Sequence, residues 1–188
     1  MRRLPLSLAF AAALLAVAPA LHAQTPAAPP PKITVCPSTA TLDELVEAID
    51  AAVSGPGNKD RTCFRALFAP DARLIPIRIA PDGTDTPRIL TVQDWIDAVA
   101  KRGDAVFYER QVKVSAESWD HMAHLWSIYE TRTTPDGKPP EGKVPEGKVV
   151  DRGINSIQAI FDGKQWHIIQ ILWQAQTPAN PVPEKYLP

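Results

Sequence analysis

Four long apolar segments follow one another from residue 105 to residue 176, and no helical pattern interrupts them. Each is rich in β-branched and aromatic residues and is bounded by turn-forming residues, which is typical of strands. The segments span residues 105–117, 122–133, 149–161 and 165–176. Asp162-Gly163 favours a tight hairpin between the last two. This half of the chain therefore predicts an antiparallel sheet of four successive strands.

The segment before residue 105 predicts three helices and one strand. The helices are predicted at 41–53, 60–69 and 91–103, and the strand at 72–79. Thr41 and Glu44 have the spacing of a capping box, and apolar residues recur at helical spacing after them. Pro76 indicates that the strand lies at an edge or carries a bulge. Helices gathered on one face of an antiparallel sheet form an α+β layer architecture.

The N-terminal residues resemble an export signal. Arg2 and Arg3 precede an uncharged apolar run, which predicts a signal peptide over residues 1–23, cleaved after Ala20 or Ala23. An uncleaved anchor is the alternative. A Pro/Ala-rich tether follows over residues 24–37. The expected location is periplasmic or secreted, with no membrane partner after cleavage.

Charge and cysteine content narrow the possible partners and covalent links. Removing residues 1–23 changes the formal net charge from −1 to −3, which excludes a basic nucleic-acid-binding surface. Cys36 and Cys63 are the two cysteines, and an oxidising compartment permits a bridge between them. The bridge requires the segment before the first helix to fold back, so two buried thiols remain the alternative.

Three stretches of the chain resemble the nuclear transport factor 2-like superfamily, in its polyketide-cyclase-like (SnoaL-like) branch. They are "FRALFAPDARLI", "TVQDWIDAVAK" and "RGINSIQAIFDGKQWHIIQILWQ". The resemblance covers residues 38–176 and leaves a Pro-rich strap at 177–188. It implies a curved, cone-shaped antiparallel sheet whose concave face is covered by the three helices. It also implies a small apolar ligand inside the cone and a homodimer through the outer face.

Strand alternation assigns side chains to the two faces of this sheet. The predicted interior includes Tyr108, His124 and Asn155, and a ligand pocket around them. The pocket is predicted to contain Trp95, Arg110, Trp126, Glu130, Ile157, Ile169, Ile171 and Trp173. The predicted dimer face contains Ser156, Gln158, Trp166 and Gln170, a mixed polar and apolar set typical of interfaces. The acidic residues of the first helix, Asp50 among them, are expected to face solvent.

The sequence leaves the activity open among three alternatives. The ketosteroid isomerases of the superfamily use two inward carboxylates, whose positions fall here on or near Pro76 and on Ile157. That departure speaks against their chemistry, and an apolar interior with few polar groups favours a module that binds a small apolar or aromatic molecule. A cofactor-free lyase or isomerase is the second alternative, with His124 as base and Tyr108 or Asn155 as polarising group. A protein-interaction or dimerisation module is the third.

No cofactor or metal site is expected from the sequence. His121 and His124 are three residues apart, and on a strand this spacing places them on opposite faces. Metal ligands must instead converge on one point. The repeated unit "PEGKVPEGKV" at 140–149 is interpreted as an elongated hairpin loop.

Overall fold

The computed structural model describes residues 34–80, 82–133 and 147–188 of the 188-residue chain. The predicted signal peptide, most of the predicted tether and most of the repeated loop lie outside the described residues. The elements are α1 (Leu42–Val53), β1 (Gly55–Pro56), α2 (Thr62–Ala66), β2 (Phe68–Ile79), β3 (Asp85–Pro87), β4 (Leu90–Thr91), α3 (Val92–Ala100), β5 (Val106–Trp119), β6 (Met122–Arg132), β7 (Val149–Phe161), β8 (Trp166–Ala175) and the 3-10 turn η1 (Glu184–Tyr186).

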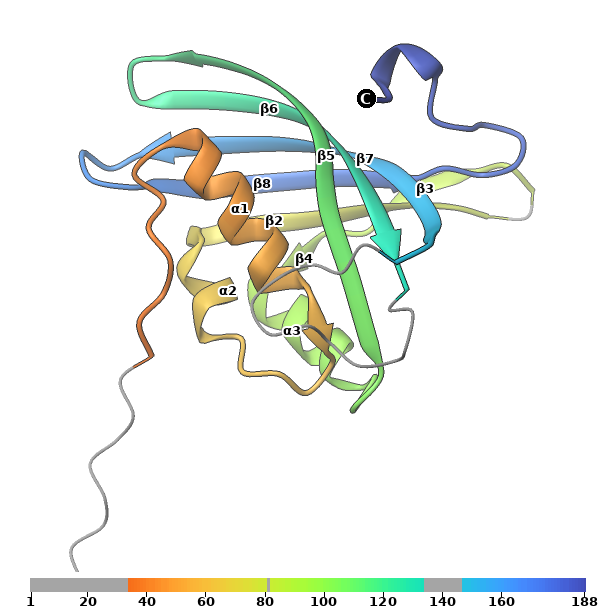
Figure 1. Ribbon diagram of the computed structural model, residues 1–188, viewed down its shortest axis with the longest axis horizontal. Coiled ribbons are helices and arrows are strands. Elements are labelled where there is room, and N and C mark those ends of the chain that lie inside the picture. Colours follow the sequence, from red (N-terminus) through yellow and green to blue (C-terminus); the bar gives the residue numbers. More distant parts are fainter. Residues whose placement is uncertain (1–33, 81, 134–146) are drawn as a thin grey trace, which may run out of the picture. The chain divides into compact units, whose positions relative to one another are not determined.

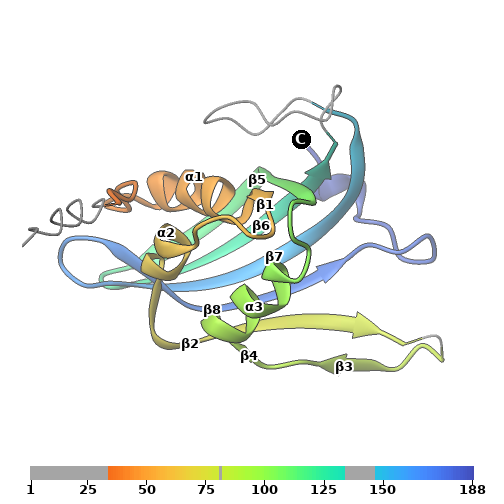
Figure 2. The same ribbon diagram turned by 90° about the horizontal axis from the view of Figure 1, so that it is seen from below.

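A strongly curved sheet of eight strands dominates the molecule (Figure 1). Its order is β1-β5-β6-β7-β8-β2-β3, and β4 pairs with β2. The strands from β5 to β8 pair antiparallel, as the sequence predicts, whereas β2 and β8 run parallel. The three helices lie on the inner, concave face of the sheet, and the sheet does not close into a barrel (Figure 2). This is the predicted α+β cone.

Two capping boxes fix the starts of α1 and α3. The Thr41 hydroxyl accepts a hydrogen bond from the Glu44 amide, and Thr91 and Asp94 repeat the arrangement. The second helix is shorter than predicted, because the chain enters β2 at Phe68 instead of continuing the helix. Among the described residues, none of the helices is both long enough and apolar enough to cross a bilayer.

The core fills the space between α1, α2 and the inner face of the sheet. Leu45 and Ile49 of α1 pack there with Leu125, Ile157 and residues of β2 and β8. Leu125 and Ile157 are completely buried and directly opposite each other on β6 and β7. This packing identifies the inner face: residues in register with Leu125 and Ile157 point toward the helices.

Bulges in β5 and β8 reverse the alternation of side chains part of the way along each strand. In β5 the register shifts between Gln111 and Lys113, and in β8 it shifts at Ile169. An extra residue on one strand turns all later side chains to the opposite face. A single alternation extended along either strand therefore assigns the residues on one side of the bulge to the wrong face.

The segment before α1 folds back along the start of β8. The Trp166 amide donates to the Thr39 carbonyl at 2.8 Å, and the Thr39 hydroxyl donates to the Trp166 carbonyl at 3.0 Å. This return brings Cys36 beside α2, where it forms a disulfide with Cys63 across a Cα–Cα distance of 5.1 Å. The bridge, left open by the sequence, is thus formed.

Candidate functional site in the cone interior

A connected set of polar side chains lies on the inner face where β5, β6 and β7 adjoin. Gln111 is at its centre: its side-chain amide donates to Glu109 at 3.0 Å, and its carbonyl oxygen accepts from Asn155 at 3.1 Å. The buried Ser127 hydroxyl donates to the same carbonyl oxygen. Asn155 also approaches Glu109 at 3.5 Å. Each member is therefore held by at least one hydrogen bond inside a largely apolar cone.

A second carboxyl group reaches this set from α1. Oδ1 of Asp50 accepts a hydrogen bond from the backbone amide of Gln111 at 3.0 Å. The neighbouring Ser54, at the end of α1, both donates to the Glu109 carbonyl and accepts from the Glu109 amide, each at 3.1 Å. These contacts hold the end of α1 against β5, so Asp50 and Glu109 flank Gln111 from two elements. Asp50 was predicted to be solvated, and this prediction was wrong.

Burial changes the acidity of both carboxyl groups. Desolvation raises the pKa of Glu109 from 4.5 to about 7, because its hydrogen bonds to Gln111 and Asn155 only partly replace water. Desolvation also raises the pKa of Asp50 from 3.8 to about 7, and the charge of Glu109 adds to this rise. Both side chains remain partly exposed. Near neutral pH each of the two carboxyl groups is therefore protonated part of the time. Both remain accessible to a solute.

Tyr129 supplies a neutral donor beside these carboxyl groups. It pairs with Gln111 across β5 and β6 and is buried, and burial together with the nearby Glu109 and Asp151 raises the pKa of its phenol. The phenol is therefore protonated at neutral pH. Its ring extends over Gly153. A Cβ atom at position 153, which any other residue would carry, would overlap the Tyr129 hydroxyl and the Gln174 carbonyl.

A groove lies near this polar set, at the adjoining ends of β5, β6 and β7, although no residue of the set lines it. It has a volume of about 460 Å³, and its lining includes Phe107 and Thr131. Thr131 is the cross-strand partner of Glu109, and Phe107 precedes Glu109 by two residues on the same strand. Two partly exposed carboxyl groups with raised pKa values and a phenol donor can together support proton transfer on a small molecule.

The three predicted catalytic residues are not brought together. Asn155 points inward, as predicted, but His124 and Tyr108 lie on the opposite face of the sheet. The exposed His124 has its Nε2 3.0 Å from the Ser156 hydroxyl. Tyr108 is buried at the rim of the groove, where its hydroxyl has no hydrogen-bond partner. The bulge after Gln111 explains the error on β5, because the inward and outward positions alternate in one phase before the bulge and in the opposite phase after it.

The predicted pocket residues divide between three environments. Trp126 and Glu130 lie on the outer face, and Arg110 is exposed there, so their predicted inward orientation was wrong. Glu130 forms ion pairs with Arg132 and, at 2.9 Å, with Arg152. The sequence missed the outward orientation because Trp126 and Ile128 make the outer face of β6 apolar as well.

The remaining pocket residues belong mostly to the core. Ile157 is completely buried, and Trp95, Ile171 and Trp173 pack against the core cluster. Trp95 stacks on Phe64 with ring centroids 4.1 Å apart. Ile169, the bulged residue of β8, is 42% exposed and does not line the interior. Trp126 and Trp173 lie on opposite faces of the sheet, so they do not enclose a pocket with the helices as the sequence predicted.

The residues predicted for a dimer face point outward, except for one. Ser156, Gln158 and Gln170 lie on the outer face. Trp166 was placed there as well, but it is buried in the core, because the bulge at Ile169 reverses the alternation between it and Gln170.

Sequence reasoning missed Asp50, Glu109 and Gln111. Asp50 lies beside the apolar stripe of α1, four residues after Val46 and three before Val53. This helical spacing was the only sequence signal that Asp50 faces the core. No residue pattern marked Glu109 and Gln111, since the bulge that turns them inward leaves no composition signature. Within the described residues, no group of three or more His, Cys, Asp or Glu side chains is arranged to hold a metal ion.

Comparison with known proteins supports the fold. The sequence matches no family model and no curated protein at a significant level. Among solved structures it is similar to a protein assigned as the beta subunit of an aromatic-ring-hydroxylating dioxygenase from Novosphingobium aromaticivorans, with 13% identity, a TM-score of 0.50, and coverage of 72% of this chain and 87% of that one. It is also similar to an NTF2-like protein of unknown function from Pseudomonas putida, with 12% identity, a TM-score of 0.49, and coverage of 78% and 94%.

The similarity to the dioxygenase beta subunit supports a shared fold and not an activity. A third similar structure, an NTF2-like protein of unknown function from Silicibacter pomeroyi, has 15% identity and a TM-score of 0.45 over 72% of this chain and 92% of that one. The chain shares its fold with the dioxygenase beta subunit, and this fold is the α+β cone implied by the resemblance to the nuclear transport factor 2-like superfamily. The branch within the superfamily stays a prediction.

Proposed function

We propose that this protein, with its nuclear transport factor 2-like fold, is a cofactor-free enzyme that transfers a proton on a small organic molecule at the open end of the cone. The observation that carries the proposal is the pair of interior carboxyl groups, Asp50 and Glu109, which flank Gln111 from a helix and a strand. The lyase or isomerase class was the second of the three alternatives that the sequence left open, and Glu109 replaces His124 as its base.

The geometry gives each residue a distinct part. Glu109 in its carboxylate form removes a proton from a carbon next to a carbonyl group, and Tyr129 provides a neutral O–H for the oxygen on which negative charge develops. Asp50 and Glu109 titrate as a pair, so near neutral pH one of them can hold a proton while the other accepts one. Ser127 and Asn155 position Gln111, and through it the Glu109 side chain.

The base is tested with a substrate that reports any reachable carboxylate. 5-Nitrobenzisoxazole loses the proton on its ring carbon to a base while its N–O bond breaks, which yields a coloured nitrile-phenolate without a co-reactant. We expect the protein to accelerate this elimination with a midpoint near pH 7, and Glu109→Gln to remove the acceleration. Glu117→Gln, which alters an exposed carboxylate on the same strand, is the matched control. Equal rates for the protein and its Glu109→Gln variant would refute the assignment of the base.

A direct titration of the two carboxyl groups tests the site without assuming any substrate. Carbon-13 NMR of the side-chain carboxyl groups should show Glu109 and Asp50 titrating near pH 7, above the ordinary range of exposed carboxyl groups. Titration of both groups below pH 5 would contradict the desolvated environment on which the proposal depends.

Export and homodimer formation are further proposals. The Cys36–Cys63 bridge supports export, because disulfides persist in oxidising compartments. Mass spectrometry of the mature chain would test it by showing whether residues 1–23 are removed. For the homodimer, the exposed outer-face residues Gln158 and Ile160 are available to a second copy. A Gln158→Glu variant should then lower the sedimentation coefficient, and an unchanged monomer in both proteins would exclude the dimer.

A further inference from the structure

Strand alternation separates the charged side chains of β6 and β7 between the two faces of the sheet. Arg152 of β7 points outward and forms an ion pair with Glu130 at 2.9 Å. Its neighbour Asp151 points inward, because it pairs with the buried Thr131, whose position on β6 is in phase with Leu125. The inner face therefore carries the acid, and the arginine beside it is engaged on the outer face.

Two partly exposed carboxyl groups of the inner face, Glu109 and Asp151, flank Thr131 from the neighbouring strands. Thr131 is the register partner of Glu109 on β5 and of Asp151 on β7, so the three residues form one row across the sheet. Strands two apart in a sheet are separated by roughly 10 Å, which leaves room for one small group between the two carboxyl side chains. Thr131 also lines the groove of about 460 Å³, so the centre of the row borders the groove.

The acids of the inner face lack a counter-charge. Among the described residues, no Lys, Arg or His side chain forms an ion pair with Asp50, Glu109 or Asp151. Carboxylates that lose water without gaining a cation or enough hydrogen bonds raise the free energy of the folded chain. A bound cation would supply the missing charge.

An unpaired hydroxyl group beside the row indicates that the ligand also carries an acceptor. Tyr129 is 5% exposed, and its hydroxyl has no hydrogen-bond partner in the described part of the chain; unlike the Tyr108 hydroxyl, it is not closed off from solvent. Desolvation and then the charges of Glu109 and Asp151 raise the pKa of the Tyr129 phenol, so the phenol lies near both carboxyl groups. Buried hydroxyl groups normally find a partner, so this one indicates a missing acceptor.

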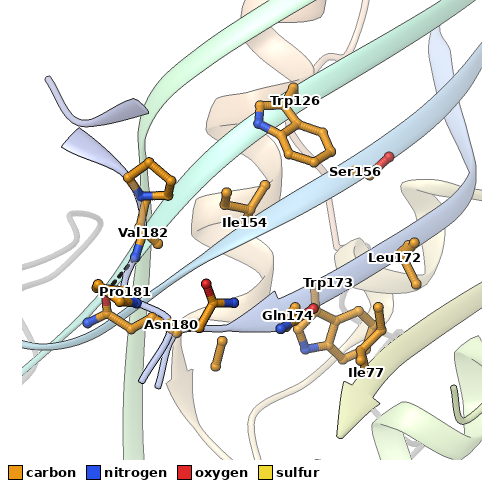
Figure 3. Close-up of a pocket in the computed structure, with 13 residues that line it drawn as sticks. Ile77, Trp126, Ile154, Ser156, Leu172, Trp173, Gln174, Asn180, Pro181 and Val182 are labelled. Carbon is orange, nitrogen blue, oxygen red and sulfur yellow. Dashed lines mark hydrogen bonds between the residues drawn. The ribbon is translucent and has the colours of Figure 1, made fainter. Parts of the chain in front are cut away.

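The pocket on the outer face has a different chemistry. The C-terminal strap, residues 177–188, crosses this face, and a pocket of about 190 Å³ lies between the strap and the sheet. Trp126, Ile154 and Val182 line it, and its lining contains no Asp, Glu, Lys, Arg or His side chain (Figure 3). A charged group would lose its hydration there without gaining a counter-charge. Recognition of a charged molecule is therefore expected of the inner face and not of this pocket.

We propose that the interior site takes a small carbonyl compound with a positively charged nitrogen next to the reacting carbon. The proposal rests on the proton transfer proposed above and names the class of its substrate. Asp151 is the counter-ion of the nitrogen, and the Tyr129 hydroxyl donates to the carbonyl oxygen. The Glu109 carboxylate takes the proton: the C–H bond breaks, an O–H bond forms on Glu109, and the electron pair moves onto the carbonyl oxygen. The same carboxylates repel an anionic substrate.

Two molecules of one shape that differ in charge test the proposal on the full chain. Acetonyltrimethylammonium carries a permanent charge on its nitrogen, and 4,4-dimethylpentan-2-one has a carbon in that place. In NMR titrations at pH 8.5 we expect the cation to bind about tenfold more tightly, a ratio between those of exposed and of desolvated ion pairs. Equal affinity, or tighter binding of the ketone, would overturn the proposal.

The affinity for the cation should also rise with pH. The groups that face the site are Asp50 of α1, Glu109 of β5, Tyr129 of β6 and Asp151 of β7; the cations packed against the same elements are Lys59, Arg102 and Arg110. Because desolvation raises the pKa values of Asp50 and Glu109 to about 7, the site gains negative charge as the pH rises through 7. The charge of the probe stays constant. An affinity for the cation that falls or stays level between pH 5.5 and 8.5 would contradict its binding beside these groups.

Two matched variants locate the counter-ion. Asp151→Asn removes the charge and keeps an oxygen for the Arg152 amide, which donates to Asp151 at 2.8 Å. It should lower the affinity for the cation about tenfold and leave that for the ketone unchanged. Glu117→Gln removes an exposed charge on the outer face of β5 and should change neither affinity. Unchanged binding of the cation by Asp151→Asn would refute the counter-ion.

Deuterium exchange separates this proposal from the proton transfer itself. In heavy water the protein should accelerate exchange of the methylene protons between the carbonyl and the charged nitrogen, and Glu109→Gln should not. Preferential binding of the cation without accelerated exchange would support the charged ligand and refute the base. Equal binding of the two probes, with exchange that depends on Glu109, would support the base and overturn the charged substrate.

Discussion

Glu109→Gln should stabilise the protein at alkaline pH and do nothing for it in acid. The variant keeps the shape of the side chain and an oxygen that can accept from Gln111 and Asn155, so only the charge changes. Folding raises the pKa of Glu109 from 4.5 to about 7. A difference of roughly 2.5 pKa units at 1.36 kcal/mol each corresponds to about 3 kcal/mol of destabilisation once the carboxyl is ionised. Because Glu109 is partly exposed, solvent screens part of this, and we expect a gain of about 1 to 3 kcal/mol at pH 8.5.

The direction with pH follows from the raised pKa. Below about pH 4 the carboxyl is protonated in both the folded and the unfolded chain, so no difference arises. As the pH rises through about 7, the folded form of the protein loses the stability that the bound proton provided, and the variant does not. Urea unfolding at pH 4 and pH 8.5, followed by fluorescence with the disulfide intact, measures the difference. The exposed Glu117→Gln is the control. A gain that is equal at the two pH values, or a loss at pH 8.5, would refute the desolvated Glu109.

Two further predictions concern the framework around the site. Gly153→Ala should lower the free energy of unfolding by about 1 to 3 kcal/mol, because the new Cβ overlaps the Tyr129 hydroxyl and the Gln174 carbonyl. An unchanged melting temperature would contradict the close approach of the Tyr129 ring. Replacing Cys36 and Cys63 by Ser should lower stability by up to about 3.5 kcal/mol, since the bridge closes a loop with a sequence separation of 27. Urea unfolding of the oxidised protein and of the double variant checks this, and identical curves would show that the bridge is absent in solution.

The architecture was predictable because its signals are local. Thr41 with Glu44 begins α1 where the capping box predicts, and the four long strands begin and end within two residues of their predicted limits. The hairpin at Asp162 forms because its carboxylate accepts from the amides of Lys164 and Gln165. The cone interior was not predictable to the same degree, since Asn155 was the only one of its polar members assigned to it.

The sequence by itself determined the element order, the helix starts and the apolar content that makes an α+β cone, because these depend on residues close together in the chain. The tertiary structure alone decided which side chains share a face. Two bulges, after Gln111 and at Ile169, turn Glu109 inward and Trp166 into the core, and a bulge is settled by pairing between strands rather than by the residues within one. The strap acts in the same way: by covering the outer face it lets Trp126 lie there, so an apolar residue no longer marks the interior.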